Sequence, residues 1–300
     1  MAEKADEEKT TDDICVEKNE DCRRFLRVHG SNAEKHSDVI VCGDFMTAKK
    51  HVIYFGGDIQ DYSEKMLFHA QTKKYNQWNL ENTAILLQKK FPDCFVFVVK
   101  PSKLNYGIFS VFSNFVISND VGVPDHSVGQ GSWHEVERLY HNTIQEILSL
   151  QDGNKGTNAA DCDVPVPVCI VGFSKGCIVL NQLVHDLEAE MESEARNFIS
   201  SVETLYWLDG GHSGSCKKTW VTNSKILEYL AQSSLKISVH VTPYQLEDTT
   251  REWIAEEEKL FVENLQQYNG KVKEKVYFSG VPRSIDKHFE LLVDFDVDLI

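Results

Sequence analysis

Short apolar runs bounded by turn residues recur along the chain and predict buried strands. Three of them, residues 25–30, 38–45 and 51–58, follow one another closely and predict consecutive strands that open a sheet. Further runs of the same kind lie at residues 94–100, 164–171, 203–209, 236–242 and 274–279. Their continuous apolar character is typical of strands that are covered on both faces.

Between the later runs, apolar residues recur every three to four positions, which predicts amphipathic helices. These segments lie at residues 82–90, 133–150, 178–187, 224–232 and 250–268, and residues 289–295 predict a closing helix. Strands that alternate with helices at this spacing predict a mainly parallel sheet with helices on both faces. In such a sheet, the functional site is expected at the carboxyl ends of the strands.

Two polar segments interrupt this pattern. Residues 1–24 are rich in Glu, Asp, Lys and Thr, and we expect a disordered acidic arm there. Residues 152–163 predict a surface loop. The remaining chain, residues 25–300, is long enough and at 42% hydrophobic content apolar enough to bury one large core, which favours a single domain.

The formal net charge of −15 narrows the range of partners. Nucleic acid and anionic membranes would repel such a surface as a whole, so small or neutral substrates are expected instead. No apolar stretch is long enough to span a membrane, and the N-terminus has neither a secretory nor a transit signature. Eight cysteines without a C-x-x-C pair, among them Cys42, Cys169 and Cys177 in predicted strands or helix, indicate a reducing compartment. Taken alone, the sequence predicts a cytoplasmic protein.

A glycine-flanked serine gives the chain its candidate chemistry. Gly172-Phe173-Ser174-Lys175-Gly176 has the G-x-S-x-G pattern of a nucleophile elbow, in which the serine occupies a strained turn between a strand and a helix. The apolar run before Ser174 and the helical spacing after it supply the required order. We interpret Ser174 as a nucleophile; a tight turn without chemistry is the alternative interpretation.

A serine nucleophile needs a base and, behind it, a carboxylate. Among the four histidines that follow Ser174, His288 is favoured as the base because it lies in a loop after the last predicted strand. Asp248, beyond the strand that ends near Thr242, is favoured as the acid, although it could simply cap the helix that follows. Asp209 in LDGGHSG is the alternative acid and could equally begin a glycine-rich turn.

An oxyanion hole needs one backbone N–H after the nucleophile and another from the loop after the third predicted strand. Lys175 would supply the first, and Gly57 or Asp58 in FGGD would supply the second. Phe55 stands where many esterases have a histidine before the glycines.

An aromatic run over residues 104–117 has a loosely helical period and predicts core more readily than a lid or an acyl pocket. His126, His134 and the pair of His212 and Cys216 lack further ligands at usable spacing. We assign no metal and no cofactor.

Several long segments carry a resemblance beyond the pentapeptide, and it covers nearly everything from Phe25 onward. The chain resembles the α/β-hydrolase superfamily and, more closely, the eukaryotic family of the human chromosome 2 open reading frame 69 protein. The segments that carry this closer resemblance are VIYFGGD, SNFV, VGFSKGC, YWLDGGHSG, WVT and HVTPYQ. It implies an α/β-hydrolase-like doubly wound sheet, an esterase-like activity and a mitochondrial location. It also supports Asp209 as a candidate for the acid.

Two functions follow as hypotheses. The first is a serine hydrolase that cleaves an ester or thioester of a small acyl substrate. The second is a non-catalytic α/β-hydrolase-like protein that binds a protein partner and keeps the elbow as scaffold, because fold alone does not imply chemistry.

Overall fold

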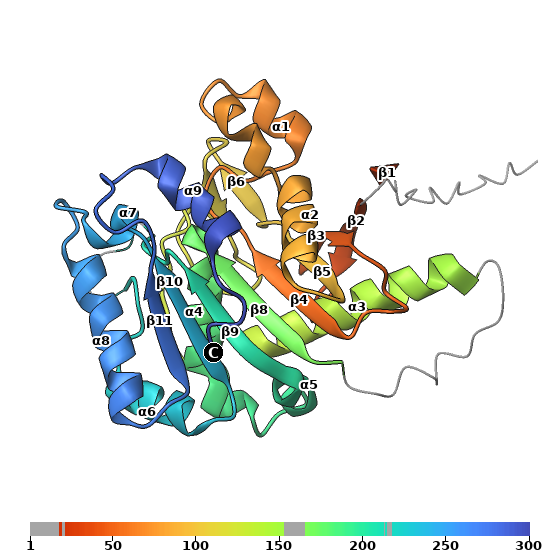
Figure 1. Ribbon diagram of the computed structural model, residues 1–300. Coiled ribbons are helices and arrows are strands. Elements are labelled where there is room, and N and C mark those ends of the chain that lie inside the picture. The colour runs from red at the N-terminus through yellow and green to blue at the C-terminus, as the bar shows by residue number, and fades with distance from the viewer. Residues whose placement is uncertain (1–17, 20–21, 153–165, 213, 215–217) are drawn as a thin grey trace, which may run out of the picture.

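One sheet carries the fold, and its strands follow the order β1-β2-β3-β5-β4-β8-β9-β10-β11 (Figure 1). The structure is a computed structural model that describes residues 18–19, 22–152, 166–212, 214 and 218–300. The strands of this sheet are β1 (Lys18–Asn19), β2 (Cys22–His29), β3 (His36–Cys42), β4 (Lys50–Phe55), β5 (Cys94–Val99), β8 (Val168–Phe173), β9 (Val202–Leu208), β10 (Lys236–Val241) and β11 (Val272–Val276).

The direction of the strands changes along the sheet. β1, β2, β3 and β5 pair antiparallel in that order, whereas β5, β4, β8, β9, β10 and β11 are joined by parallel pairing. The expected mainly parallel sheet is therefore confirmed. Because β4 lies between β5 and β8, the chain order reverses there, and the carboxyl ends of β4 and β8 form the crevice where such sheets place their ligands.

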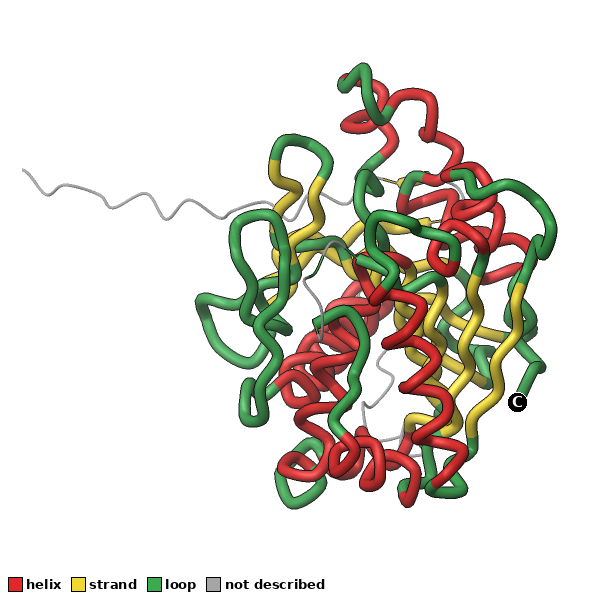
Figure 2. The backbone as a smooth tube through the Cα atoms, turned by 90° about the vertical axis from the view of Figure 1, so that its left-hand side faces the viewer, coloured by secondary structure: helices red, strands yellow, loops and turns green. Residues whose placement is uncertain are grey.

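Helices cover both faces of the sheet (Figures 1 and 2). They are α1 (Ser63–Phe68), η1 (Lys73–Trp78), α2 (Leu80–Lys90), α3 (Ser132–Asp152), η3 (Ser174–Gly176), α4 (Cys177–Glu190), α5 (Arg196–Ser201), α6 (Ser224–Gln232), α7 (Pro243–Leu246), α8 (Trp253–Gln267) and α9 (Ile285–Asp294). The buried side chains divide into two clusters. Helices α3, α4, α6 and α8 contribute to one, and α2 and α9 contribute to the other.

Alternation along the strands explains why there are two clusters. Ile53 and Phe55 of β4 belong to the first, whereas Val52 and Tyr54 belong to the second, as expected when successive side chains point to opposite faces. Every position of β5 and β8 is buried. This burial on both faces is the physical reason for their unbroken apolar sequences.

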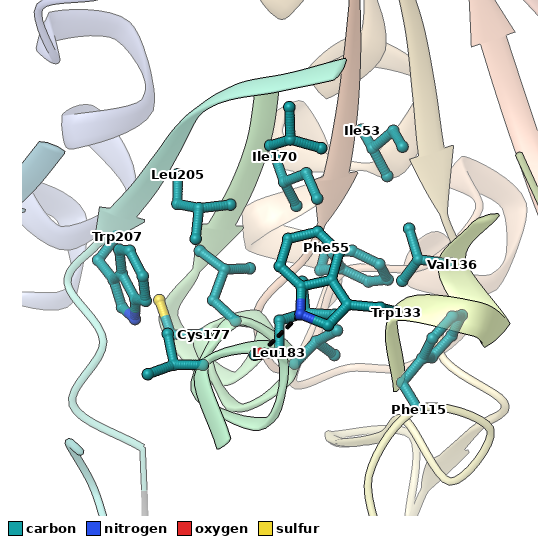
Figure 3. Packing of buried hydrophobic residues seen from close by; sticks show 14 of the residues in the cluster. Ile53, Phe55, Phe115, Trp133, Val136, Ile170, Cys177, Leu183, Leu205 and Trp207 are labelled. Atoms are coloured by element: carbon teal, nitrogen blue, oxygen red, sulfur yellow. Dashed lines mark hydrogen bonds between the residues drawn. The ribbon is translucent and has the colours of Figure 1, made fainter. Parts of the chain in front are cut away.

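The first cluster packs α3 against α4 beneath the sheet (Figure 3). The Trp133 side chain of α3 is fully buried, and its Nε1 atom donates a hydrogen bond of 2.7 Å to the carbonyl oxygen of Leu183. The start of α3 is fixed by carboxylates from α4. Glu190 accepts hydrogen bonds from the backbone N–H groups of Trp133 and His134, and Asp186 accepts one from Ser132. Negative charge at a helix N-terminus is favourable because the N–H groups there have no partner within the helix.

The aromatic run at residues 104–117 departs from the expected helical period. It forms a hairpin of β6 (Lys103–Asn105) and β7 (Phe109–Val111), followed by the buried side chains of Phe112 and Phe115. Tyr106 at the hairpin tip is 82% exposed. The acidic arm and the loop predicted at residues 152–163 lie largely outside the described residues.

Candidate active site

Ser174 lies at the turn between β8 and α4 with a φ of 51°, in the left-handed region that side chains other than glycine rarely occupy. The two flanking glycines are needed for close packing. A Cβ atom on Gly172 would lie 3.0 Å from Cys177 Cα, and one on Gly176 would collide with the carbonyl oxygen of Phe55. The strand, the turn and the helix therefore have the geometry that a nucleophile elbow requires, and Ser174 stays partly exposed.

His288 lies in the first turn of α9 and faces the carboxyl end of β9. Its Nδ1 atom is 2.8 Å from the Oδ2 atom of Asp209. The imidazole is sandwiched between the rings of Phe173 and Tyr244, each with a centroid distance of 4.5 Å. Because Phe173 directly precedes Ser174, this stacking holds the ring beside the nucleophile turn. With Nδ1 turned to the carboxylate, Nε2 is the nitrogen left for a proton transfer.

Asp209 is itself held in place at the end of β9. It has a φ of 48° and is 1% exposed. Its Oδ1 atom accepts a hydrogen bond of 2.8 Å from the backbone N–H of Thr242, and its Oδ2 atom accepts one of 2.6 Å from the Thr242 hydroxyl. Its own N–H donates to the carbonyl oxygen of His240. This carboxylate is oriented by β10 and aimed at His288.

Asp248, the acid that the sequence favoured, has other partners. It accepts hydrogen bonds from the Thr250 hydroxyl at 2.7 Å, from Arg251 at 2.6 Å and from Arg283 at 3.0 Å. Burial favours a higher pKa for this carboxyl, but the hydrogen bonds from Thr250 and Arg251 outweigh it and hold the pKa below its ordinary value. The structure thus brings His288 together with Asp209, the alternative acid, and not with Asp248. The physical reason is that Asp248 lies beyond α7, which follows β10 directly, and is paired there with Arg251 and with Arg283 from the connection between β11 and α9.

The loop after β4 lies against the nucleophile. A Cβ atom on Gly57 would be 2.9 Å from Ser174 Cβ. The backbone N–H of Gly57 donates a hydrogen bond of 2.8 Å to Gln60 Oε1, and its carbonyl oxygen accepts one of 2.7 Å from the Ser110 hydroxyl. Since Gln60 already occupies the Gly57 N–H, Asp58 is the better of the two expected donors from this loop.

Gln60 was missed by the sequence analysis. Its side chain is fully buried and makes four hydrogen bonds: Oε1 accepts from Gly57 N–H and from the Tyr54 hydroxyl, and Nε2 donates to Trp78 O and Thr83 Oγ1. It ties the loop that carries Gly57 and Asp58 to β4, η1 and α2. The only sequence signal for it is its position three residues after Gly57.

Two charged side chains lie beside the expected oxyanion donors. The Lys175 side chain is fully buried, and its Nζ atom is 3.4 Å from the Val121 carbonyl oxygen. Burial lowers the pKa of Lys175, and the nearby Asp58 carboxylate opposes that shift. Burial likewise raises the pKa of Asp58, and Lys175 opposes that change. Each charge therefore offsets part of the desolvation of the other.

Two of the other three histidines after Ser174 have partners of their own. His240 in β10 is hydrogen-bonded to Ser238 at 2.8 Å and to Tyr277 at 2.9 Å. The ring of His185 on α4 stacks on that of His126 at 5.4 Å. His288 is the histidine that the structure pairs with Asp209.

The strand order, the serine turn after β8 and the helices on both faces define an α/β-hydrolase fold. The chain belongs to the C2orf69 family, whose model matches residues 24–165 and 158–271. The mitochondrial protein C2orf69 homolog of Mus musculus is 34% identical over 320 residues, covering 91% of this chain and 87% of that protein. The mitochondrial protein C2orf69 of Homo sapiens is 36% identical over 281 residues, covering 80% of this chain and 73% of that protein.

Solved structures agree on the fold. The poly(3-hydroxybutyrate) depolymerase LpqC of Bordetella parapertussis is similar with a TM-score of 0.50 at 11% identity, covering 91% of this chain and 87% of that one. At this identity the likeness concerns the fold alone.

The names of the relatives support a mitochondrial family, as the resemblance implied. The cytoplasmic location expected from the sequence alone stays a prediction. Among the described residues, none of the helices combines the length and the apolar character needed to cross a membrane.

Proposed function

We propose that the protein is a serine hydrolase that cleaves ester or thioester bonds of a small acyl substrate. The observation that carries this proposal is the 2.8 Å contact between His288 Nδ1 and Asp209 Oδ2 beside the strained turn of Ser174. A buried carboxylate behind a histidine fixes the tautomer of the imidazole and stabilises its protonated form. In this proposal Ser174 is the nucleophile, His288 the general base and Asp209 the acid.

The reaction would proceed in two halves. Ser174 Oγ attacks the acyl carbon while its proton moves to His288 Nε2, and the oxyanion is held by the backbone N–H groups of Lys175 and Asp58. The carbon–oxygen or carbon–sulfur bond of the leaving group then breaks, and the imidazolium returns the proton to that group. Water, deprotonated by His288, attacks the acyl-serine, which releases the acid and restores Ser174.

The packing of the site supports this assignment over a non-catalytic scaffold. Phe55, which replaces the histidine of many esterases, packs edge-on against Phe112 and Phe115 with centroid distances of 5.8 and 5.1 Å. Its place is therefore in the core and not beside the substrate. A buried carboxylate also lies within hydrogen-bond distance of His288 Nδ1, as a catalytic histidine requires.

An active-site-directed fluorophosphonate probe tests the proposal. We expect covalent labelling of the folded wild-type protein, loss of labelling after heat denaturation and no labelling of Ser174→Ala. Ser233→Ala, at a half-buried serine directly after α6, is the matched control and should be labelled like the wild type. If the folded wild type is not labelled, or if Ser174→Ala is labelled equally well, the proposal fails. Hydrolysis of esters and thioesters of graded chain length would then define the acyl group.

A further inference from the structure

Three large apolar side chains are exposed at the end of the molecule that carries the candidate site. Leu67 and Phe68 at the end of α1 are 47% and 85% exposed, and Tyr106 at the tip of the β6–β7 hairpin is 82% exposed. We call these three residues the apical patch. Single exposed apolar residues are ordinary, whereas a contiguous group marks an interaction surface.

The two segments of the apical patch touch each other. A Cβ atom on Gly107 would lie 3.2 Å from Nε2 of His69, so the His69 ring packs on the hairpin tip. His69 directly follows Phe68, and Gly107 directly follows Tyr106. The contact therefore places the end of α1 beside the tip of the hairpin, at the end of the molecule where Figure 1 shows α1 and β6.

The segment that carries Leu67 and Phe68 has a charge opposite to that of the whole chain. Residues 62–79 contain three lysines, Lys65, Lys73 and Lys74, and one acid, Glu64, which gives a net charge of +2 against −15 for the chain. All three lysines are exposed, whereas Glu64 is paired with Arg24 at 2.7 Å. Since salt screens charges beyond about 10 Å, the local sign decides what can bind there. Residues 62–79 can therefore attract anionic lipid although the chain as a whole is negative.

We propose that the apical patch docks on the surface of a bilayer that contains anionic phospholipid. Aromatic side chains favour the headgroup level of a bilayer, and lysines beside them are attracted by anionic lipid. Lysine is depleted in protein–protein interfaces, which makes a lipid surface the better match. The patch also lies at a helix end and a hairpin tip, a shape that suits insertion into a soft surface.

Docking in this way would place the candidate site next to the membrane. α1 begins shortly after Asp58, and Tyr75 and Trp78 of η1 stack on Phe289 with centroid distances of 5.5 and 5.8 Å. Phe289 directly follows His288. The docking itself does not depend on the activity of Ser174, so binding can be tested whether or not the protein is a hydrolase.

The experiment is co-sedimentation of the full chain with phosphatidylcholine vesicles and with vesicles that also contain about 30% phosphatidylglycerol. We expect binding to the anionic vesicles that weakens as salt is added. The Phe68→Ser/Tyr106→Ser double variant should bind at least about tenfold more weakly. Replacing Lys65, Lys73 and Lys74 by Glu should abolish the preference for anionic lipid.

Met46→Ser is the matched control, because Met46 is 61% exposed but lies in the connection that precedes β4, at the opposite end of that strand from the candidate site. It should bind like the wild type. All substituted side chains are exposed, and unchanged thermal unfolding would show that the variants fold. Absence of wild-type binding to anionic vesicles, or equal binding of the double variant, overturns the proposal and would leave a protein as the occupant of the patch.

Discussion

The Nδ1 atom of His288 lies 2.8 Å from the Oδ2 atom of Asp209, which ends the strand next to the one that carries Ser174. Asp209 in turn receives two hydrogen bonds from Thr242 at the end of β10. Three neighbouring parallel strands therefore contribute to one constellation: β8 the serine, β9 the carboxylate and β10 the group that orients it. The register of these strands therefore sets the relative positions of the serine turn and of the carboxylate.

Substituting each candidate acid in turn distinguishes between Asp209 and Asp248, the two aspartates that the sequence proposed. Asp209→Asn should lower ester hydrolysis by roughly 10²-fold to 10⁴-fold, because an amide cannot hold the productive tautomer of His288 or stabilise its protonated form. Asp248→Asn should leave hydrolysis within a few-fold of wild type and cost about 1 kcal/mol of stability through weaker pairing with Arg251 and Arg283.

Steady-state hydrolysis and urea unfolding of both variants check this prediction. The Thr242 hydrogen bonds also make Asp209 a structural residue, so the loss of activity must be measured on protein that remains folded. Activity that survives in Asp209→Asn and disappears in Asp248→Asn would assign the acid to Asp248.

Gln60→Leu tests whether activity requires the hydrogen bond by which Gln60 fixes the loop after β4. The change leaves the buried Gly57 N–H and Tyr54 hydroxyl without their acceptor, which should cost about 2 kcal/mol or more of stability. Hydrolysis should show a kcat about tenfold lower with little change in KM, because an oxyanion donor is used mainly in the transition state.

Thr83→Val is the control for this prediction. It removes one acceptor of Gln60 Nε2 but leaves the bond to Gly57 intact. Its kcat should stay near that of the wild type. Equal effects of the two substitutions on kcat would mean that Gln60 acts only through general stability.

The strand, turn and helix around Ser174 could be predicted because the signal is local. The β-branched run, the two glycines and the helical spacing occupy one continuous segment, and each has one dominant physical interpretation. His288 could be proposed as the base because it follows the last predicted strand, where this fold commonly carries its histidine. The sequence placed it before the closing helix, and the structure places it in the first turn of α9.

The acid could not be chosen from the sequence. Asp209 and Asp248 each follow a strand that ends at the same edge of the sheet, so both patterns fit. The difference comes from Arg283, which reaches Asp248 across 35 positions in the chain, and from Thr242, which reaches Asp209 across 33. Contacts at such separations leave no periodic signal in the sequence.

The hairpin at residues 103–111 was missed for a different reason. Its aromatic residues repeat at intervals that imitate a helical period. Tyr106 and Gly107 instead adopt φ values of 56° and 66°, which reverse the chain between β6 and β7. A glycine in the middle of a short aromatic run was the available signal for a turn.

The left-handed backbone of Ser174 should affect the free energy of unfolding of its variants. Its φ of 51° is strained for any residue with a Cβ atom. Ser174→Gly should therefore be more stable than Ser174→Ala by about 1 kcal/mol, although both remove the hydroxyl. At Ser233, where φ is −73°, the order should reverse and alanine should be the more stable replacement. Urea unfolding of the four variants checks both orders, and a Ser174→Ala protein as stable as Ser174→Gly would contradict the strain.

Glu258 on α8 predicts a dependence of stability on pH. Its side chain is nearly fully buried, and its Oε1 atom has no hydrogen-bond partner among the described residues. Burial, with smaller contributions from Glu274 and Asp209, raises the pKa of this carboxyl to about 8. Between its ordinary pKa near 4.5 and this value, the unfolded chain gives up the proton while the folded protein keeps it. The free energy of unfolding should therefore fall as the pH rises through this window.

Glu258→Gln removes the ionisable group and should stabilise the protein at pH 8 by on the order of 3 to 4 kcal/mol relative to its effect at pH 5. Urea unfolding of wild type and variant at the two pH values measures the difference. A stabilisation of the same size at both pH values would mean that the buried carboxyl does not stay protonated in the folded protein. Greater stabilisation at pH 5 would reverse the sign of the linkage and place the pKa of Glu258 below its ordinary value.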